Sequence, residues 1–161
     1  MRRRELLLAA AGTLVVPAAA SAATPTEGDV LLDLMHREQS AKLAYGAASK
    51  TLGSQAPQEL VTIRQHESDH ADALSTELAA VGLGRPLRPP LSGTAQELAE
   101  ASDRRAVLDA AVKLEDELVD AYRSSLVLLP DAKIAMTAAT ILASHAQHGF
   151  ILGLAAGRPG S

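Results

Sequence analysis

The chain has 161 residues, of which 47% are hydrophobic and only 2% aromatic, which suits one domain with one core. Its apolar content comes mainly from alanine and leucine, which favour helices over sheets, so the sequence predicts an all-α protein. A formal net charge of −4 argues against nucleic acid or an anionic membrane as the partner. The chain has no cysteine, which excludes disulfides and a covalently attached c-type haem.

The N-terminus has the three parts of an export signal. Arginines at residues 2–4 precede an apolar run at residues 6–16, and an A-x-A sequence at residues 20–22 fits a cleavage site. The apolar run is shorter than the roughly 20 residues that a permanent membrane anchor needs. We therefore expect residues 1–22 to be a cleaved signal and residues 23–161 to be a secreted or periplasmic domain. Paired arginines followed by leucines resemble a twin-arginine signal, which exports folded proteins.

Four segments carry apolar residues at helical spacing and are separated by glycine and proline. We expect helices from about Gly28 to Leu52, from Pro57 to Val81, within Thr94 to Leu129, and from Pro130 to Ala155. The sequence TAQE, which begins at Thr94, fits a capping box for the third helix. The connections after the first and third helices are short, whereas the segment from Gly82 to Ala101 is long enough to run the length of a bundle. This order predicts a four-helix bundle with one long crossover between the second and third helices.

Six polar side chains fall on the apolar stripes of these helices, where burial without a partner is costly. They are Glu38, Glu67, His70, Glu115, His145 and His148. Helical spacing would bring all six to one point at mid-height of the bundle, and carboxylates and imidazoles are the usual donors for transition metals. We therefore expect the six to be metal ligands. The alternative is a closed network of ion pairs between glutamate and protonated histidine in a metal-free scaffold or interaction protein.

An internal repeat supports this convergence. The fragments EQSAKLAY and EDELVDAY each place a tyrosine seven residues after a glutamate, and these residues, Tyr45 and Tyr122, are the only tyrosines in the chain. The fragments HESDHADAL and SHAQHGFIL share a frame in which Glu67 aligns with His145. The two helical hairpins therefore look like copies about a pseudo-twofold axis. We expect the tyrosines to fill the core and hydrogen-bond the ligand carboxylates, with a redox role beside a metal as the alternative.

The four motifs, in this order and at this spacing, resemble the ferritin-like superfamily, and most closely the small exported ferritin-like and rubrerythrin-like domains of bacteria. The resemblance covers residues 29–156. It implies terminal carboxylates from Glu38 and Glu115, and the pair Glu67 and His70 from the second helix. It also implies a metal-binding protein that oxidises Fe(II) or serves in metal storage and detoxification. The alanine-rich outer faces are compatible with a homo-oligomer.

The fourth helix departs from the family pattern. His148 matches it, but His145 stands where the family has a glutamate that bridges two metals. A neutral imidazole has one lone pair free for a metal, so only Glu67 could bridge. Three carboxylates and three imidazoles favour a single or softer divalent ion over an intact di-iron centre, and they leave iron, zinc, copper, nickel and manganese open.

The stretch RQHESDHAD also contains His66-Glu67-x-x-His70, the pattern of zinc peptidases. At 100° per residue, Glu67 lies near the centre of the buried stripe and His66 lies about 80° from it, so the two histidines do not share the inward face. Asp69 adds a charge inside the motif, and no strand that could bind a substrate is predicted downstream. We therefore disfavour a peptidase and expect His66 to lie behind the ligands or at the surface.

Overall fold

The structure, a computed structural model, describes residues 24–158, and these residues form helices and loops without a strand. The elements are α1 (Glu27–Leu52), a short 3-10 helix η1 (Gly53–Gln55), α2 (Gln58–Ala80), α3 (Gly93–Glu100), α4 (Arg104–Leu126) and α5 (Ala132–Ala155). The all-α prediction is confirmed. None of the described helices is both long and apolar enough to cross a membrane. The predicted export signal lies outside the described residues.

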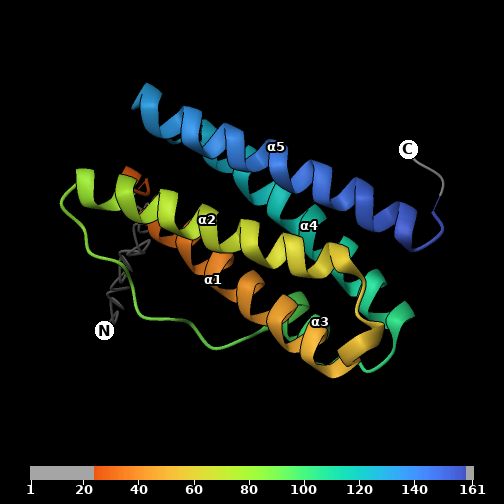
Figure 1. Cartoon of the computed structure of the whole chain (residues 1–161). Coiled ribbons are helices and arrows are strands. Elements are labelled where there is room, and N and C mark those ends of the chain that lie inside the picture. Colours follow the sequence, from red (N-terminus) through yellow and green to blue (C-terminus); the bar gives the residue numbers. More distant parts are fainter. Residues whose placement is uncertain (1–23, 159–161) are drawn as a thin grey trace, which may run out of the picture.

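The four long helices form two antiparallel hairpins that pack side by side (Figure 1). Helix α1 packs against α2 and α4 packs against α5, while α1 also contacts α4 and α2 contacts α5. The segment of residues 81–92 runs back along the bundle, so that α4 begins at the same end as α2 (Figure 1). The predicted four-helix bundle with one long crossover is confirmed.

The third predicted helix is divided into α3 and α4 by a short break. Asp103 caps α4, because its carboxylate accepts a hydrogen bond from the backbone N–H of Ala106 at 2.9 Å. The predicted capping box at Thr94 is wrong, since the Thr94 hydroxyl instead donates to Glu117 Oε1 at 2.6 Å. This bond fastens the short helix α3 to α4.

Side-chain caps also fix where α1 and α5 begin. Thr26 and Asp29 form a reciprocal capping box at the start of α1. At the start of α5, Asp131 accepts from the backbone N–H groups of Lys133 and Ile134 at 2.8 and 3.1 Å. These caps satisfy N–H groups that would otherwise lack partners at the helix ends.

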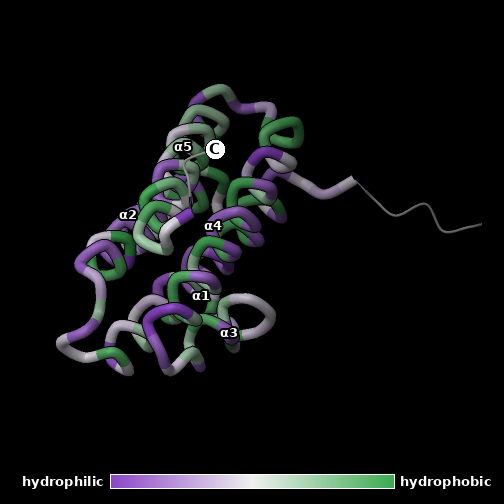
Figure 2. Tube along the Cα trace, turned by 90° about the vertical axis from the view of Figure 1, so that its right-hand side faces the viewer, coloured by the Kyte–Doolittle hydropathy of each residue, from purple (hydrophilic) through white to green (hydrophobic). Residues whose placement is uncertain are grey.

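The apolar core has two clusters, one toward each end of the bundle, with polar side chains between them. One cluster joins the first half of α1 to the second half of α2 and includes Leu31, Leu34 and Leu78. The other joins the second half of α1 to α3 and the first half of α4, and it includes Leu98 and Val107. In Figure 2, hydrophobic and hydrophilic stretches alternate along the helices, as expected when each helix buries one face.

Candidate metal centre

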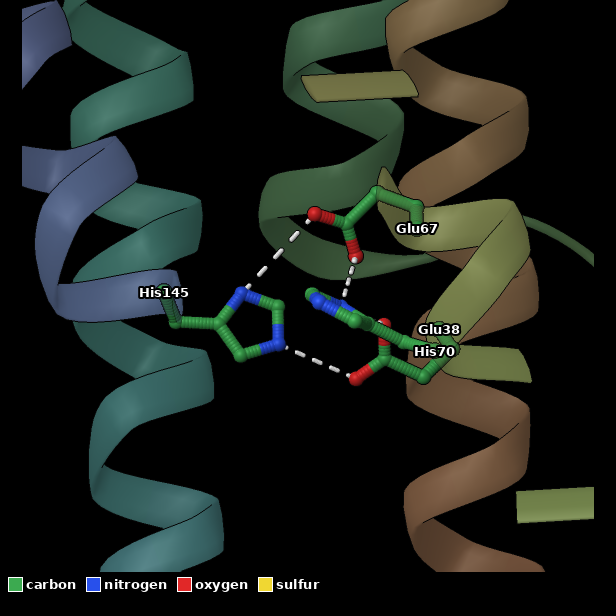
Figure 3. A group of neighbouring side chains, drawn as sticks. All are labelled: Glu38, Glu67, His70 and His145. Atoms are coloured by element: carbon green, nitrogen blue, oxygen red, sulfur yellow. Dashed lines mark hydrogen bonds and ion pairs between the residues drawn. The ribbon is translucent and has the colours of Figure 1, made fainter. Parts of the chain in front are cut away.

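All six predicted ligands lie together between the two apolar clusters, and they come from all four long helices. Glu38 lies on α1, Glu67 and His70 on α2, Glu115 on α4, and His145 and His148 on α5. The three glutamates and His145 have no exposed surface, and His148 is 4% exposed. Figure 3 shows His145 reaching from α5 toward the glutamates of α1 and α2.

The donor atoms of these side chains form two overlapping groups. One group is Glu38, Glu67, His70 and His145, and the other is Glu67, Glu115, His145 and His148. Within each group, one donor atom per residue lies within 4.8 Å of the others. Donors on opposite sides of an ion bound at about 2.1 Å are about 4.2 Å apart, so small side-chain shifts would bring either group onto one ion. The buried cluster could therefore hold a metal ion.

Among the three carboxylates of the cluster, Glu67 is the one without hydrogen bonds. Both of its oxygens are buried and neither has a hydrogen-bond partner. The nearest imidazole nitrogens are Nδ1 of His148 at 3.4 Å and Nδ1 of His70 and His145 at 3.8 Å. Burial raises the pKa of Glu67 to about 7, and the charge of Glu38 acts in the same direction. A buried carboxylate with no hydrogen bond is costly, which is the situation that a bound cation relieves.

His145 bonds the terminal carboxylates of both hairpins. Its Nε2 lies 3.0 Å from Glu38 Oε1 and its Nδ1 lies 2.8 Å from Glu115 Oε2. Burial would lower the pKa of His145, but the two carboxylates raise it to about 11. Burial likewise would raise the pKa of Glu38 and Glu115, but the bonds from His145 hold both below their usual range. An imidazolium, which donates from both nitrogens, therefore occupies the position where a bridging glutamate was expected.

The two outer histidines turn Nδ1 toward the centre. His70 Nδ1 lies 3.2 Å from Glu38 Oε2. His148 Nδ1 lies 3.4 Å from both Glu67 and Glu115 but has no hydrogen-bond partner. Burial opposes protonation, yet the carboxylates raise the pKa of His70 to about 9 and shift the pKa of His148 in the same direction. Protons on the histidines thus balance the glutamates, and they would have to leave when an ion binds.

Two tyrosines hold the terminal carboxylates in place. The Tyr122 hydroxyl donates to Glu38 Oε1 at 2.6 Å, and the Tyr45 hydroxyl donates to Glu115 Oε1. Burial and the adjacent carboxylates raise the pKa of both tyrosines, which keeps their hydroxyls protonated as donors. The predicted tyrosine–carboxylate bonds are confirmed. Because the two bonds are reciprocal between α1 and α4, they also agree with the internal repeat.

His66 lies behind His148 and does not join the donor groups. Its Nδ1 is 2.9 Å from His148 Nε2, and the two rings stack at 18° with centroids 5.1 Å apart. Burial, with the charges of His148 and His70, lowers the pKa of His66. The direct contact with His148 was not predicted from the sequence, where the only signal was the position of His66 at the edge of the buried stripe. The structure also gives no support to a peptidase, since residues 24–158 form no substrate-binding strand.

Comparison with known proteins agrees with this fold. A family model described as a ferritin-like domain matches residues 9–157, and the chain therefore belongs to that family. The fold is similar to the crystal structure of a conserved hypothetical protein from Mycobacterium tuberculosis, with a TM-score of 0.70 and 18% sequence identity. The match covers 81% of this chain and 90% of that chain, and at this identity it concerns the fold alone. No curated protein matches the sequence.

Proposed function

We propose that this protein is an exported metal-binding ferritin-like protein whose first divalent transition ion binds between Glu67, Glu115, His145 and His148. The observation that carries the proposal is a set of buried donor atoms without partners: both oxygens of Glu67, and Nδ1 of His148 at 3.4 Å from one of them. A closed ion-pair network would have satisfied these atoms, because buried polar groups are rarely left unpaired. A cation with carboxylate and imidazole ligands would satisfy all three.

Iron is the first candidate ion, with zinc, copper and manganese as the others. Iron bound here would supply redox chemistry toward oxygen or peroxide, in an Fe(II) oxidase or in metal storage and detoxification. The chain's own contribution is to fix the ligands and to exclude water. Tyr45 and Tyr122 hold the outer carboxylates, and the two apolar clusters enclose the site at both ends.

Metal content per chain tests the proposal. We would purify the exported protein without added metal and compare it with Glu67→Gln by elemental mass spectrometry. Glu77→Gln is the matched control, since Glu77 is also buried but binds Lys133 and Thr137 outside the cluster. We expect at least one transition ion per chain in the wild type and in Glu77→Gln, and loss of the ion in Glu67→Gln. A metal-free wild type, or full occupancy in Glu67→Gln, would contradict the proposal.

A metal-free scaffold is the second candidate function, and the double hydrogen bond of His145 favours it. An imidazolium between Glu38 and Glu115 supplies the positive charge that an ion would otherwise bring. Under this alternative, the wild type contains no metal, whereas His145→Glu acquires it. That pair of results would identify a ferritin-like bundle that lost its ion through one position.

Export is the part of the proposal that rests on residues 1–22 alone. The arginine pair and the A-x-A sequence support it, and a twin-arginine route would allow an ion to be loaded before export. Replacing Arg3 and Arg4 together by lysine keeps the charge but removes the arginine pair. We expect the precursor to accumulate inside the cell, and normal export of the double variant would point to the general route instead.

A further inference from the structure

His66 and His148 connect the buried cluster to the edge of the bundle. His148 Nδ1 faces Glu67 and Glu115, and its other nitrogen, Nε2, lies 2.9 Å from His66 Nδ1. Ser144 Oγ approaches the same Nε2 at 3.3 Å. Two side chains therefore converge on the nitrogen of His148 that points away from the cluster.

We propose that His66 is a positioning residue for the metal ligand His148. By accepting a hydrogen bond from Nε2–H of His148, His66 holds the remaining proton of His148 on Nε2 when an ion binds, so that Nδ1 is the nitrogen that loses its proton and is directed at the ion. A neutral imidazole carries one proton, so a bond that places it on Nε2 leaves the lone pair on Nδ1. The inference rests on the proposed function, because it assigns a role toward the same ion.

The surroundings of His66 favour a role in positioning His148 over a role as the ligand that first captures an ion from solvent. The side chain is half-buried, and the surface cavity that it lines also contains Lys42 and Arg64. The two cationic side chains that line the cavity make it an unfavourable entry point for a divalent ion. The second ring N–H of a metal-bound histidine usually donates to a carboxylate, a carbonyl or water, and here the imidazole of His66 provides that acceptor.

The internal repeat shows why His148 is better oriented than its counterpart. In the shared frame of HESDHADAL and SHAQHGFIL, Ser144 aligns with His66 and His148 aligns with His70. Both His66 and Ser144 nevertheless approach His148. Within residues 24–158, no equivalent bond reaches Nε2 of His70. Of the two donor groups, the one that contains His148 therefore has the better oriented histidine for binding an ion.

Zinc binding by the full mature chain tests this role. The affinity for Zn(II) is measured by competition with a chromogenic chelator, and the proton position on His148 is read from imidazole nitrogen NMR of the Zn(II)-loaded protein. His66→Leu removes the acceptor, whereas His66→Asn places an amide oxygen near the position of Nδ1. Two variants serve as controls: His36→Leu removes a histidine outside the site, and Ser144→Ala removes the longer of the two contacts to Nε2 of His148.

We expect wild-type His148 to carry its proton on Nε2, with Nδ1 bound to Zn(II). His66→Leu should weaken Zn(II) binding by about 10- to 100-fold, while His66→Asn and both controls should bind like the wild type. Unchanged affinity in His66→Leu, or equal loss in His66→Asn, would overturn the positioning role and leave the proposed function standing. A wild-type chain that binds none of the candidate ions, Fe(II), Zn(II), Cu(II) and Mn(II), would overturn both.

Discussion

The hydroxyl of Tyr122 on α4 donates a 2.6 Å hydrogen bond to Glu38 Oε1 on α1, and Tyr45 on α1 makes the reciprocal bond to Glu115 on α4. Each helical hairpin therefore fixes a carboxylate of the other. All four side chains are fully buried, so water cannot replace a missing hydroxyl. The two bonds consequently contribute both to the docking of the hairpins and to the orientation of the candidate ligands.

Tyr122→Phe should lower the free energy of unfolding of the metal-free protein by about 1–3 kcal/mol, because it leaves a buried charged oxygen with one donor fewer. Urea unfolding measures the change. The reciprocal bond makes Tyr45→Phe the natural comparison, and we expect a loss of similar size. Ordinary surface substitutions change the free energy of unfolding by less than about 0.5 kcal/mol. A loss within that range in both variants would show that the two hydroxyl groups do not stabilise the folded protein.

Helical periodicity predicted the convergence of the candidate ligands, because the position of a residue along a helix decides which face it occupies. Glu38 and Glu115 were placed on inner faces by this rule alone, and the structure buries both completely. The break between α3 and α4 was not predicted, because the one helix start in this segment was assigned to Thr94 and none to Asp103, which caps α4. Thr94 lies inside α3, and its hydroxyl bonds Glu117 of α4 instead of capping a helix, a tertiary contact that the local sequence does not show.

The contact between His66 and His148 could not be read from the sequence for a different reason. The wheel angle put His66 at the edge of its stripe, but the bond depends on how closely α2 approaches α5 at that level. The double bond of His145 likewise depends on the spacing of helices on both sides of it. Spacing between helices is set by the packing of all four, and no local pattern encodes it.

His145→Glu should destabilise the metal-free protein and increase the stabilisation that metal provides. The substitution removes the cation between Glu38 and Glu115 and adds a fourth carboxylate, so like charges are buried together. An ion would relieve this repulsion and would no longer compete with an imidazolium. Thermal unfolding with a chelator and then with excess Fe(II) or Zn(II) measures both effects. Equal metal-induced shifts in the variant and the wild type would contradict the expectation, and His36→Glu controls for the added charge.

Asp131→Ala should separate stability from metal binding. The substitution removes the cap of α5, where Asp131 accepts from two backbone N–H groups, and a lost cap costs about 1 kcal/mol. The candidate ligands of α5 lie more than three helical turns away. We therefore expect a lower unfolding free energy with unchanged metal content. Metal loss in this variant at temperatures well below its unfolding would indicate that the start of α5 controls the site.

The metal-free protein should lose stability as pH rises above about 6.5. His145 and His70 have pKa values of about 11 and about 9 in the folded protein, against an ordinary value of 6.5. The pKa of Glu67 is likewise raised from 4.5 to about 7. All three groups bind protons more tightly when folded. The contribution of Glu67 is lost between about pH 4.5 and pH 7, whereas that of the two histidines is complete below about pH 6.5 and is lost as pH rises through their folded values. Thermal midpoints with chelator should be lower at pH 9 than at pH 6.5, and His145→Gln should flatten this dependence.

Metal affinity should follow the opposite course and increase with pH, because an ion must displace the protons that the folded cluster holds. Glu67, with its pKa raised to about 7, and His148, whose pKa is also raised, are largely protonated in weak acid. Between pH 6 and pH 8 these protons become easier to remove, so Zn(II) should bind more tightly while the metal-free protein becomes less stable. Chelator competition across this range measures the trend, and Glu77→Gln should leave it unchanged. Affinity independent of pH would place the ion on exposed carboxylates instead, since these have already lost their protons at pH 6.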